Sequence, residues 1–139
     1  MNDDDLTILI CETLGHMPGW NWWETSTPYP VDEVGIYYGD LPADGPDQAI
    51  GVSVYDAQDP LHLSWRNVQL RIRGKQRDKR SADKLGSFAF IAMQRLSRVG
   101  GISDTSRISF APLGADGNAR EERTENYIII LDNPEVTAS

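Results

Sequence analysis

The sequence has few of the residues from which metal sites and nucleophilic active sites are built. In 139 residues it contains one cysteine, Cys11, and two histidines, His16 and His62. A single cysteine excludes an internal disulfide and a zinc site with several cysteine ligands. Because apolar residues surround Cys11, we expect it to pack in the core. The two histidines lack the spacing of a metal-binding pair, so we assign them neither a metal nor a catalytic role.

Signatures of enzymes and of membrane segments are also missing. The sequence has no G-x-x-x-x-G-K-[ST], G-x-G-x-x-G, H-E-x-x-H, G-x-S-x-G or C-x-x-C motif. No apolar run approaches the roughly 18 residues that a membrane-spanning helix needs, and the start MNDDD lacks the basic region of a signal peptide. We therefore expect no enzyme activity, no cofactor, no membrane association and no export signal.

Positive charge is absent from the first part of the chain. Residues 1–65 contain 12 Asp and Glu and no Lys or Arg, whereas residues 66–139 contain 9 acidic and 13 basic residues, which gives charges of −12 and +4. One interpretation is that the fold brings the two parts together and neutralises them internally. The other is a subunit with one acidic and one basic surface, which favours head-to-tail contacts that close into a ring. The sequence leaves both open.

The clearest pattern is a strand, a basic turn and a helix between Trp65 and Leu96. The strand alternates apolar and polar residues, and its apolar members are Val68, Leu70 and Ile72. The helix, over about residues 81–97, carries an apolar stripe formed by Leu85, Phe88, Ala89, Ala92, Met93 and Leu96. We expect this stripe to pack on the sheet, with Ser81 as the helix N-cap and Gly100 and Gly101 at the helix end.

Phe90 and Ile91 point away from the centre of this stripe. A helix that is buried on one side only would leave both side chains in water, so they require a second cover. Another segment of the same chain is one possible cover. The other is a neighbouring subunit, because paired large apolar residues on an exposed helix face indicate a contact surface.

The remaining elements are shorter. We expect a helix at residues 3–14 and strands at residues 34–38, 48–55, 107–113 and 125–132. The last two strands are expected to form a hairpin in which Pro112 requires an edge or a bulge. Residues 16–30 are expected to form a loop that aromatic residues anchor against the body or a neighbouring subunit, namely Trp20, Trp22 and Trp23.

Together these elements predict one α+β domain over residues 1–139, with a mostly antiparallel β-sheet and helices packed on one face. No repeat or linker divides the chain. Residues 134–139 have nothing to bury, and we expect a disordered tail there.

A run of basic residues surrounds the turn after the central strand: Arg71, Arg73, Lys75, Arg77, Lys79, Arg80 and Lys84. Such a run indicates contacts to phosphate, as in nucleic-acid binding. The overall acidity and the lack of aromatic residues in the run favour a solvated turn or an acidic protein partner instead. We expect the turn to lie at one end of the sheet, where four side chains are candidates for a partner contact: Lys75, Arg77, Lys79 and Arg80.

Three segments resemble the tail-terminator or minor-capsid proteins of long-tailed bacteriophages. They read GDLPADGPDQAIGVSVYD, VQLRIRGKQRDKRSADKLGSFAFIAMQRL and ISFAPLGADGNAREERTENYIIILDN, and the likeness spans about residues 34–132. Its specific parts are the entry Pro46-Asp47-Gln48-Ala49-Ile50, the strand V-Q-L-R-I-R-G and the turn L-G-x-D-x-x-x-R from Leu113 to Arg120. None of these parts is a catalytic signature.

The resemblance implies a structural virion protein with a tail-terminator-like fold. Proteins of this family form a hexameric ring that caps the tail tube and joins it to the head connector. The implied partners are other copies of the chain, the tail tube protein, a head–tail connector or stopper protein, and genomic DNA that passes through the ring. The resemblance also places the protein at the head-proximal end of the tail, after synthesis in the host bacterial cytoplasm.

Two other functions remain open at this point. One is a head-completion or adaptor ring protein, which belongs to the same process of phage assembly. The other is a small nucleic-acid-binding module that uses the basic run 71–84.

Overall fold

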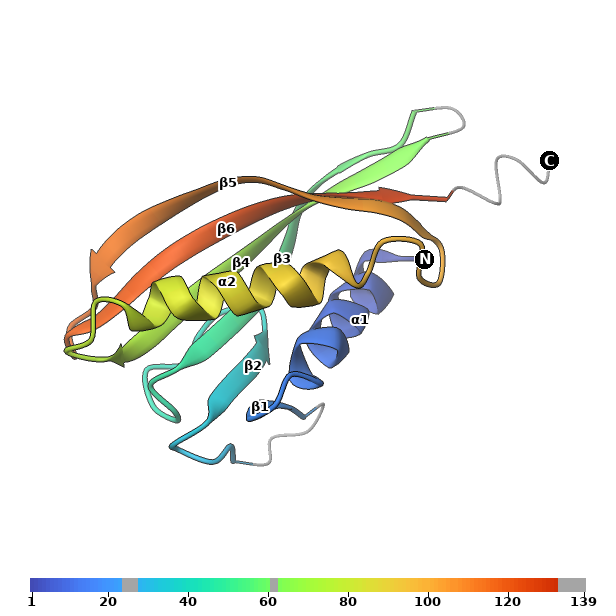
Figure 1. Cartoon of the computed structure of the whole chain (residues 1–139). Coiled ribbons are helices and arrows are strands. Elements are labelled where there is room, and N and C mark those ends of the chain that lie inside the picture. Colours follow the sequence, from blue (N-terminus) through green and yellow to red (C-terminus); the bar gives the residue numbers. More distant parts are fainter. Residues whose placement is uncertain (24–27, 61–62, 133–139) are drawn as a thin grey trace.

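Two helices cover one face of a six-stranded sheet in the described part of the chain (Figure 1). The structure is a computed structural model and describes residues 1–23, 28–60 and 63–132. Its elements are α1 (Asp3–Gly15), β1 (Trp20–Trp22), β2 (Val34–Tyr38), β3 (Ala49–Gln58), β4 (Ser64–Gln76), α2 (Ser81–Gln94), β5 (Ile102–Ala115) and β6 (Arg120–Leu131). The predicted α+β class, with helices on one face, is confirmed. His62 and the predicted disordered tail lie outside the described residues.

The sheet is mixed, with strand order β1-β2-β3-β4-β6-β5. β1 pairs with β2 and β2 with β3 in parallel, whereas the other pairs are antiparallel. The prediction of a mostly antiparallel sheet therefore holds for β3 to β6. It misses the pair of β1 with β2 because residues 16–30 were expected to form a loop, which is wrong for Trp20–Trp22. It misses the pair of β2 with β3 because only ten residues, 39–48, join these strands, and a short connection usually indicates an antiparallel hairpin.

The core lies between the sheet and the two helices. α1 contacts β1, β2 and β3, and α2 contacts β4, β5 and β6 (Figure 1). The alternation predicted for the central strand is confirmed, since its apolar members Val68, Leu70 and Ile72 are fully buried. Cys11 is buried in the same core, and burial raises the pKa of its thiol to about 12. This confirms the expectation of a packed rather than reactive cysteine.

Both helix ends of α2 differ from the prediction. Ser81 is not the N-cap, because its Oγ accepts a hydrogen bond from the backbone amide of Lys75 at 2.9 Å, at the end of β4. The residue at the cap position is Arg80, whose side chain makes no capping bond. The helix ends at Gln94, well before the predicted glycines, and further turns lead from there into β5.

Phe88 is predicted in the core and is instead 51% exposed. The face of α2 that meets the sheet consists mainly of small residues: Ala82, Gly86, Ala89 and Ala92. These small side chains allow the helix to lie close to the sheet, and they move the centre of the buried face away from the large aromatic residues. Phe88 and Phe90 consequently lie on the two flanks of the helix.

Candidate functional site

Three turns meet at one end of the sheet and form what we call the loop cluster. It consists of residues 42–48 before β3, residues 77–80 between β4 and α2, and residues 116–119 between β5 and β6. Figure 1 shows the last two turns side by side, and the amide of Arg77 donates to the carbonyl oxygen of Ala119 at 2.8 Å. The loop cluster therefore contains most of two of the motifs that carry the resemblance to tail terminators, the Pro46–Ile50 entry and the Leu113–Arg120 turn, and the third motif, V-Q-L-R-I-R-G, lies in β4 and leads toward it.

Arg73 of β4 holds the first of these turns. It is 3% exposed, and its guanidinium donates to the carbonyl oxygens of Pro42, Pro46 and Asp47 at 2.7, 2.8 and 2.9 Å. Burial, and then the charge of nearby Arg120, lowers the pKa of Arg73. This arginine of the V-Q-L-R-I-R-G strand thus satisfies three backbone carbonyl groups of the loop.

Arg120 connects the first turn to the third. It is buried at the start of β6 and donates to Asp116 at 2.8 Å, to the Asp47 carboxylate at 3.3 Å and to the carbonyl oxygen of Ala43 at 3.1 Å. Although burial opposes it, hydrogen bonding from Arg120 and Asn118 lowers the pKa of Asp116. The Asp and Arg of the L-G-x-D-x-x-x-R turn therefore form one ion pair that also reaches the loop before β3.

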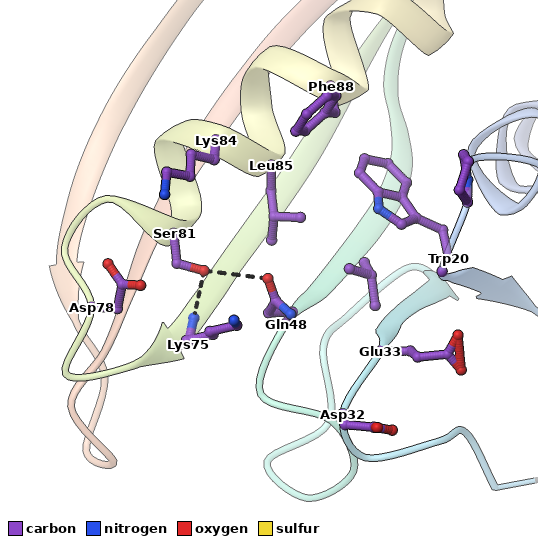
Figure 2. A pocket seen from close by; sticks show the side chains of 13 residues that line it. Trp20, Asp32, Glu33, Gln48, Lys75, Asp78, Ser81, Lys84, Leu85 and Phe88 are labelled. Atoms are coloured by element: carbon purple, nitrogen blue, oxygen red, sulfur yellow. Dashed lines mark hydrogen bonds between the residues drawn. The ribbon is translucent and has the colours of Figure 1, made fainter.

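The second turn is fixed by Ser81 at the start of α2. Figure 2 shows its Oγ between the amide of Lys75 and the side chain of Gln48, at 2.9 and 3.4 Å. A Cβ at Gly74 would lie 2.6 Å from the amide nitrogen of Ala82, so only glycine permits this close approach of strand and helix. The ends of β4 and α2 that flank the basic turn are consequently held in fixed positions.

The structure divides the predicted basic run into two groups. Arg71 pairs with Glu122 at 2.9 Å, and Arg73 is buried against the loop. The other five cations are exposed and have no ion pair within the described residues: Lys75, Arg77, Lys79, Arg80 and Lys84. The four predicted contact residues therefore lie together at the loop cluster and are accessible to a partner.

A groove of about 320 Å³ lies beside the loop cluster, between the N-terminal half of α2 and the segment with β1 and the start of β2 (Figure 2). We call it the Phe88 groove, and its apolar lining is formed by Trp20, Val34, Leu85 and Phe88. Asp32 and Glu33 lie on the β2 side, and Lys75 and Lys84 lie on the side of β4 and α2. The groove thus has an apolar centre and an acidic wall, and on its other side Asp78 accompanies the two lysines.

The other flank of α2 covers a buried cluster of charged side chains. Glu125 has no exposed surface, and Arg123 Nη2 lies 2.9 Å from its Oε2. The Tyr127 hydroxyl donates to Glu125 Oε1 at 2.8 Å, and burial followed by the Glu125 charge raises the pKa of Tyr127. Arg107 Nη1 lies 3.6 Å from the same oxygen. A Cβ at Gly86 would clash with Glu125 Oε2, so a glycine allows the helix to pack on this cluster.

Two arginines of this cluster also stack on aromatic rings. The Arg107 guanidinium lies 4.4 Å from the centre of the Phe90 ring, and that of Arg123 lies 4.4 Å from the centre of the Phe110 ring. β5 therefore supplies an intramolecular cover for part of Phe90. Ile91 is 48% exposed and projects from the outer face of α2. The role of Phe90 and Ile91 in a subunit contact stays a prediction.

β5 presents an apolar surface that the sequence interpretation missed. Ile108, Phe110 and Leu113 are each about half exposed, and we call them the β5 ridge. β5 is an outer strand, as Pro112 predicts, and its second edge has no strand partner in the described ranges. The signal was the run ISFAPLGA at residues 108–115, which contains no charged residue on an edge strand.

The described residues contain neither a cluster of metal ligands nor a helix that could span a membrane. No group of three or more His, Cys, Asp or Glu side chains in residues 1–23, 28–60 and 63–132 is placed to hold a metal ion. Within the same ranges, each helix is too short or too polar to cross a lipid bilayer.

Comparison with models of protein families gives a match. A family model described as bacteriophage tail terminator protein matches residues 21–133. The matched region includes all three turns of the loop cluster, both flanks of α2 and the whole β5–β6 hairpin. A search of curated proteins found no match.

Proposed function

The chain belongs to the bacteriophage tail terminator family and is a structural protein of the phage tail, and we propose that its copies form a ring that ends the tail tube. The ring is hexameric in this proposal, and it joins the tube to the connector of the head. The tail tube protein and a connector or stopper protein are its partners, and genomic DNA passes through its centre. The family is a structural one, which supports a role without catalysis.

The family match is the observation that carries this proposal. It extends from β1 to the end of β6, so that it includes every strand of the sheet and the helix α2. The distribution of charge adds support, because exposed cations gather on the basic turn while acidic residues gather on the segments before β4. Unlike charges on different surfaces of one subunit favour heterologous contacts, which close into rings.

The basic turn is the proposed electrostatic part of the subunit contact. Lys75, Arg77, Lys79 and Arg80 are exposed and have no ion pair within the described residues, and they meet the acidic surface of the next subunit or of the tail tube. Each exposed ion pair contributes only about 0–1 kcal/mol. A ring repeats the contact at every subunit, so the small contributions accumulate.

The mass of the purified protein in solution tests the ring. Native mass spectrometry and negative-stain images should show hexameric rings, and a protein that stays monomeric at every concentration would contradict the proposal. Reversal of Arg77 and Lys79 to Glu should weaken assembly, most strongly at low salt where like charges repel. The matched control reverses Arg95 and Arg98, two exposed cations beyond the other end of α2, and should assemble normally.

Two alternatives are separated by the same material. A nucleic-acid-binding module is favoured by the five exposed cations around the basic turn, and it requires salt-sensitive retardation of DNA by the unmodified protein. It is weakened by Arg71 and Arg73, which the fold uses for an ion pair and for the loop before β3. A head-completion or adaptor ring would bind isolated heads and leave tails unchanged.

A further inference from the structure

The β5 ridge and the Phe88 groove are two apolar surfaces that remain about half exposed, although Arg123 stacks on one side of Phe110 in the ridge. The ridge belongs to the last strand in the sheet order, whereas the groove is bounded by β1 and β2 at the other edge. A head-to-tail contact requires two different surfaces on one chain, and a small rotation between subunits then closes the ring. Their position at opposite edges of one sheet meets this requirement.

The ridge is built by irregularities of the strand. The pairing of β5 with β6 shifts between Arg107 and Ser109 and between Pro112 and Gly114, which leaves Ile108 and Leu113 as the extra residues of two bulges. Bulges redirect side chains and interrupt the ladder of backbone hydrogen bonds. Edge strands usually carry charges that prevent contacts, but residues 108–115 carry none. Side-chain docking therefore suits this edge better than addition of another strand.

The chemistry of the groove suits an apolar ridge of this kind. Phe88 is half exposed at its upper side, and Leu85 and Trp20 face its interior (Figure 2). Charged side chains occupy the walls, which leaves an apolar centre inside a charged rim, the usual arrangement of a protein interface. A segment without charges suits this groove because it brings no unpaired ion of its own into the interface.

Charge complementarity identifies the occupant as a second copy of the chain. The basic turn lies next to the β5–β6 turn through the hydrogen bond from Arg77 to Ala119, so it lies at the same end of the sheet as Leu113. Asp32 and Glu33 on the groove wall have no ion pair in the described residues. When the ridge of one copy reaches the groove of another, the cations of the first face these two carboxylates of the second.

We propose that the β5 ridge of one subunit packs into the Phe88 groove of the next subunit. The inference rests on the ring proposed above and specifies which two surfaces form its repeating contact. It also assigns the exposure of Phe88 to assembly, since the ridge of the neighbour covers that side chain in the ring.

A mixing experiment tests this contact. One variant carries Ile108→Asp and Leu113→Asp, and the other carries Phe88→Asp. Each variant alone should lose ring formation while it keeps the far-ultraviolet circular dichroism of the unmodified protein. Each still has one intact surface, so an equimolar mixture should give a heterodimer and no larger species. Rings from either variant alone, or a mixture that stays monomeric, would overturn the proposal.

Cross-linking provides a second measurement that does not depend on buried charges. In a Cys11→Ser background, a chain with Leu113→Cys and Phe88→Cys should form disulfide ladders between subunits under mild oxidation. The matched control replaces Phe88→Cys with Asn21→Cys on β1, behind the groove, and should give no ladder. Equal ladders from both chains, or none from the first, would overturn the contact.

Failure of this contact and failure of the ring proposal give different results when the variants are compared with the unmodified protein. Rings that persist in both surface variants would leave the ring function standing and remove only this contact. A protein that never forms rings would remove both.

Discussion

The two flanks of α2 resemble each other in sequence, but other parts of the chain cover only one of them. Each carries a phenylalanine, Phe88 or Phe90, only two positions apart. β5 covers Phe90 with the guanidinium of Arg107, above a buried cluster around Glu125. Phe88 lies over an open groove beside β2. The difference shows that the strand order, rather than the helix sequence, decides which aromatic side chain is covered.

Two kinds of contact fix α2 to the sheet, and the open flank contributes little to either. On the covered flank, close approach at Gly86 and a network of charged groups determine the position of the helix. Along the middle, small and aliphatic side chains fill the space to the sheet. The open flank contributes little to the fold of the single chain, so it is available for contacts with other molecules.

The largest expected effect is loss of the charged cluster on the covered flank. Glu125→Ala should lower the free energy of unfolding by about 3–5 kcal/mol, because it leaves Arg123 and Arg107 partly buried without their common anion. Chemical denaturation measures this change. Glu122→Ala is the matched control, since Glu122 pairs with the exposed Arg71, and it should cost no more than about 1 kcal/mol. Equal costs would refute the special role of this flank.

The second-largest loss of stability is expected from the middle of α2, the face that packs on the sheet. Leu85 is buried against the sheet, and Leu85→Ala should lower the free energy of unfolding by roughly 2–5 kcal/mol through lost burial and a residual cavity. Thermal unfolding, followed by circular dichroism, reports the loss as a lower melting temperature. A variant that unfolds at the original temperature would show that α2 docks by a different face.

The smallest effect is expected on the open flank. Phe88→Ser should change the stability of the single chain by no more than about 1 kcal/mol, because half of the side chain is already in water. The same variant should impair assembly. Ile91→Ser and Phe90→Ser, measured beside it, show how far the contact extends around the helix. A strong loss of monomer stability from Phe88→Ser would remove the distinction between the flanks.

The sequence predicted those elements whose pattern is local. The alternation of Val68, Leu70 and Ile72 has a period of two and one buried face, so it identified β4 and its inward side. The limits of β2 at Val34 and Tyr38 were also correct. The predicted burial of Phe88 was wrong because the prediction centred the apolar stripe of α2 on its largest residues. The sheet instead accepts the small ones, which no local pattern reveals.

The candidate site was predictable only in part. Four exposed cations were correctly placed together on the turn at one end of the sheet. The contacts of Arg73 and Arg120 with the loop before β3 were not predictable, because those partners lie 26 to 77 positions away along the chain. Only the pairing of Arg120 with Asp116, four positions away, is local. In the sequence Arg73 was one cation of the basic run and Arg120 was the last residue of the L-G-x-D-x-x-x-R turn, and only the fold places both against carbonyl groups of the loop.

The loop between β2 and β3 has a consequence for the order in which the chain folds. Parallel neighbours are usually connected by a helix that satisfies its own backbone groups, whereas this loop takes its hydrogen bonds from Arg73 and Arg120. Arg73 reaches its position only after β4 has paired with β3, and Arg120 only after β6 has paired with β4. Contacts of such long sequence separation form slowly. We therefore expect the loop between β2 and β3 to become ordered last, after the antiparallel part of the sheet. In a hydrogen-exchange experiment, the amides of this loop should exchange with solvent before those of β4.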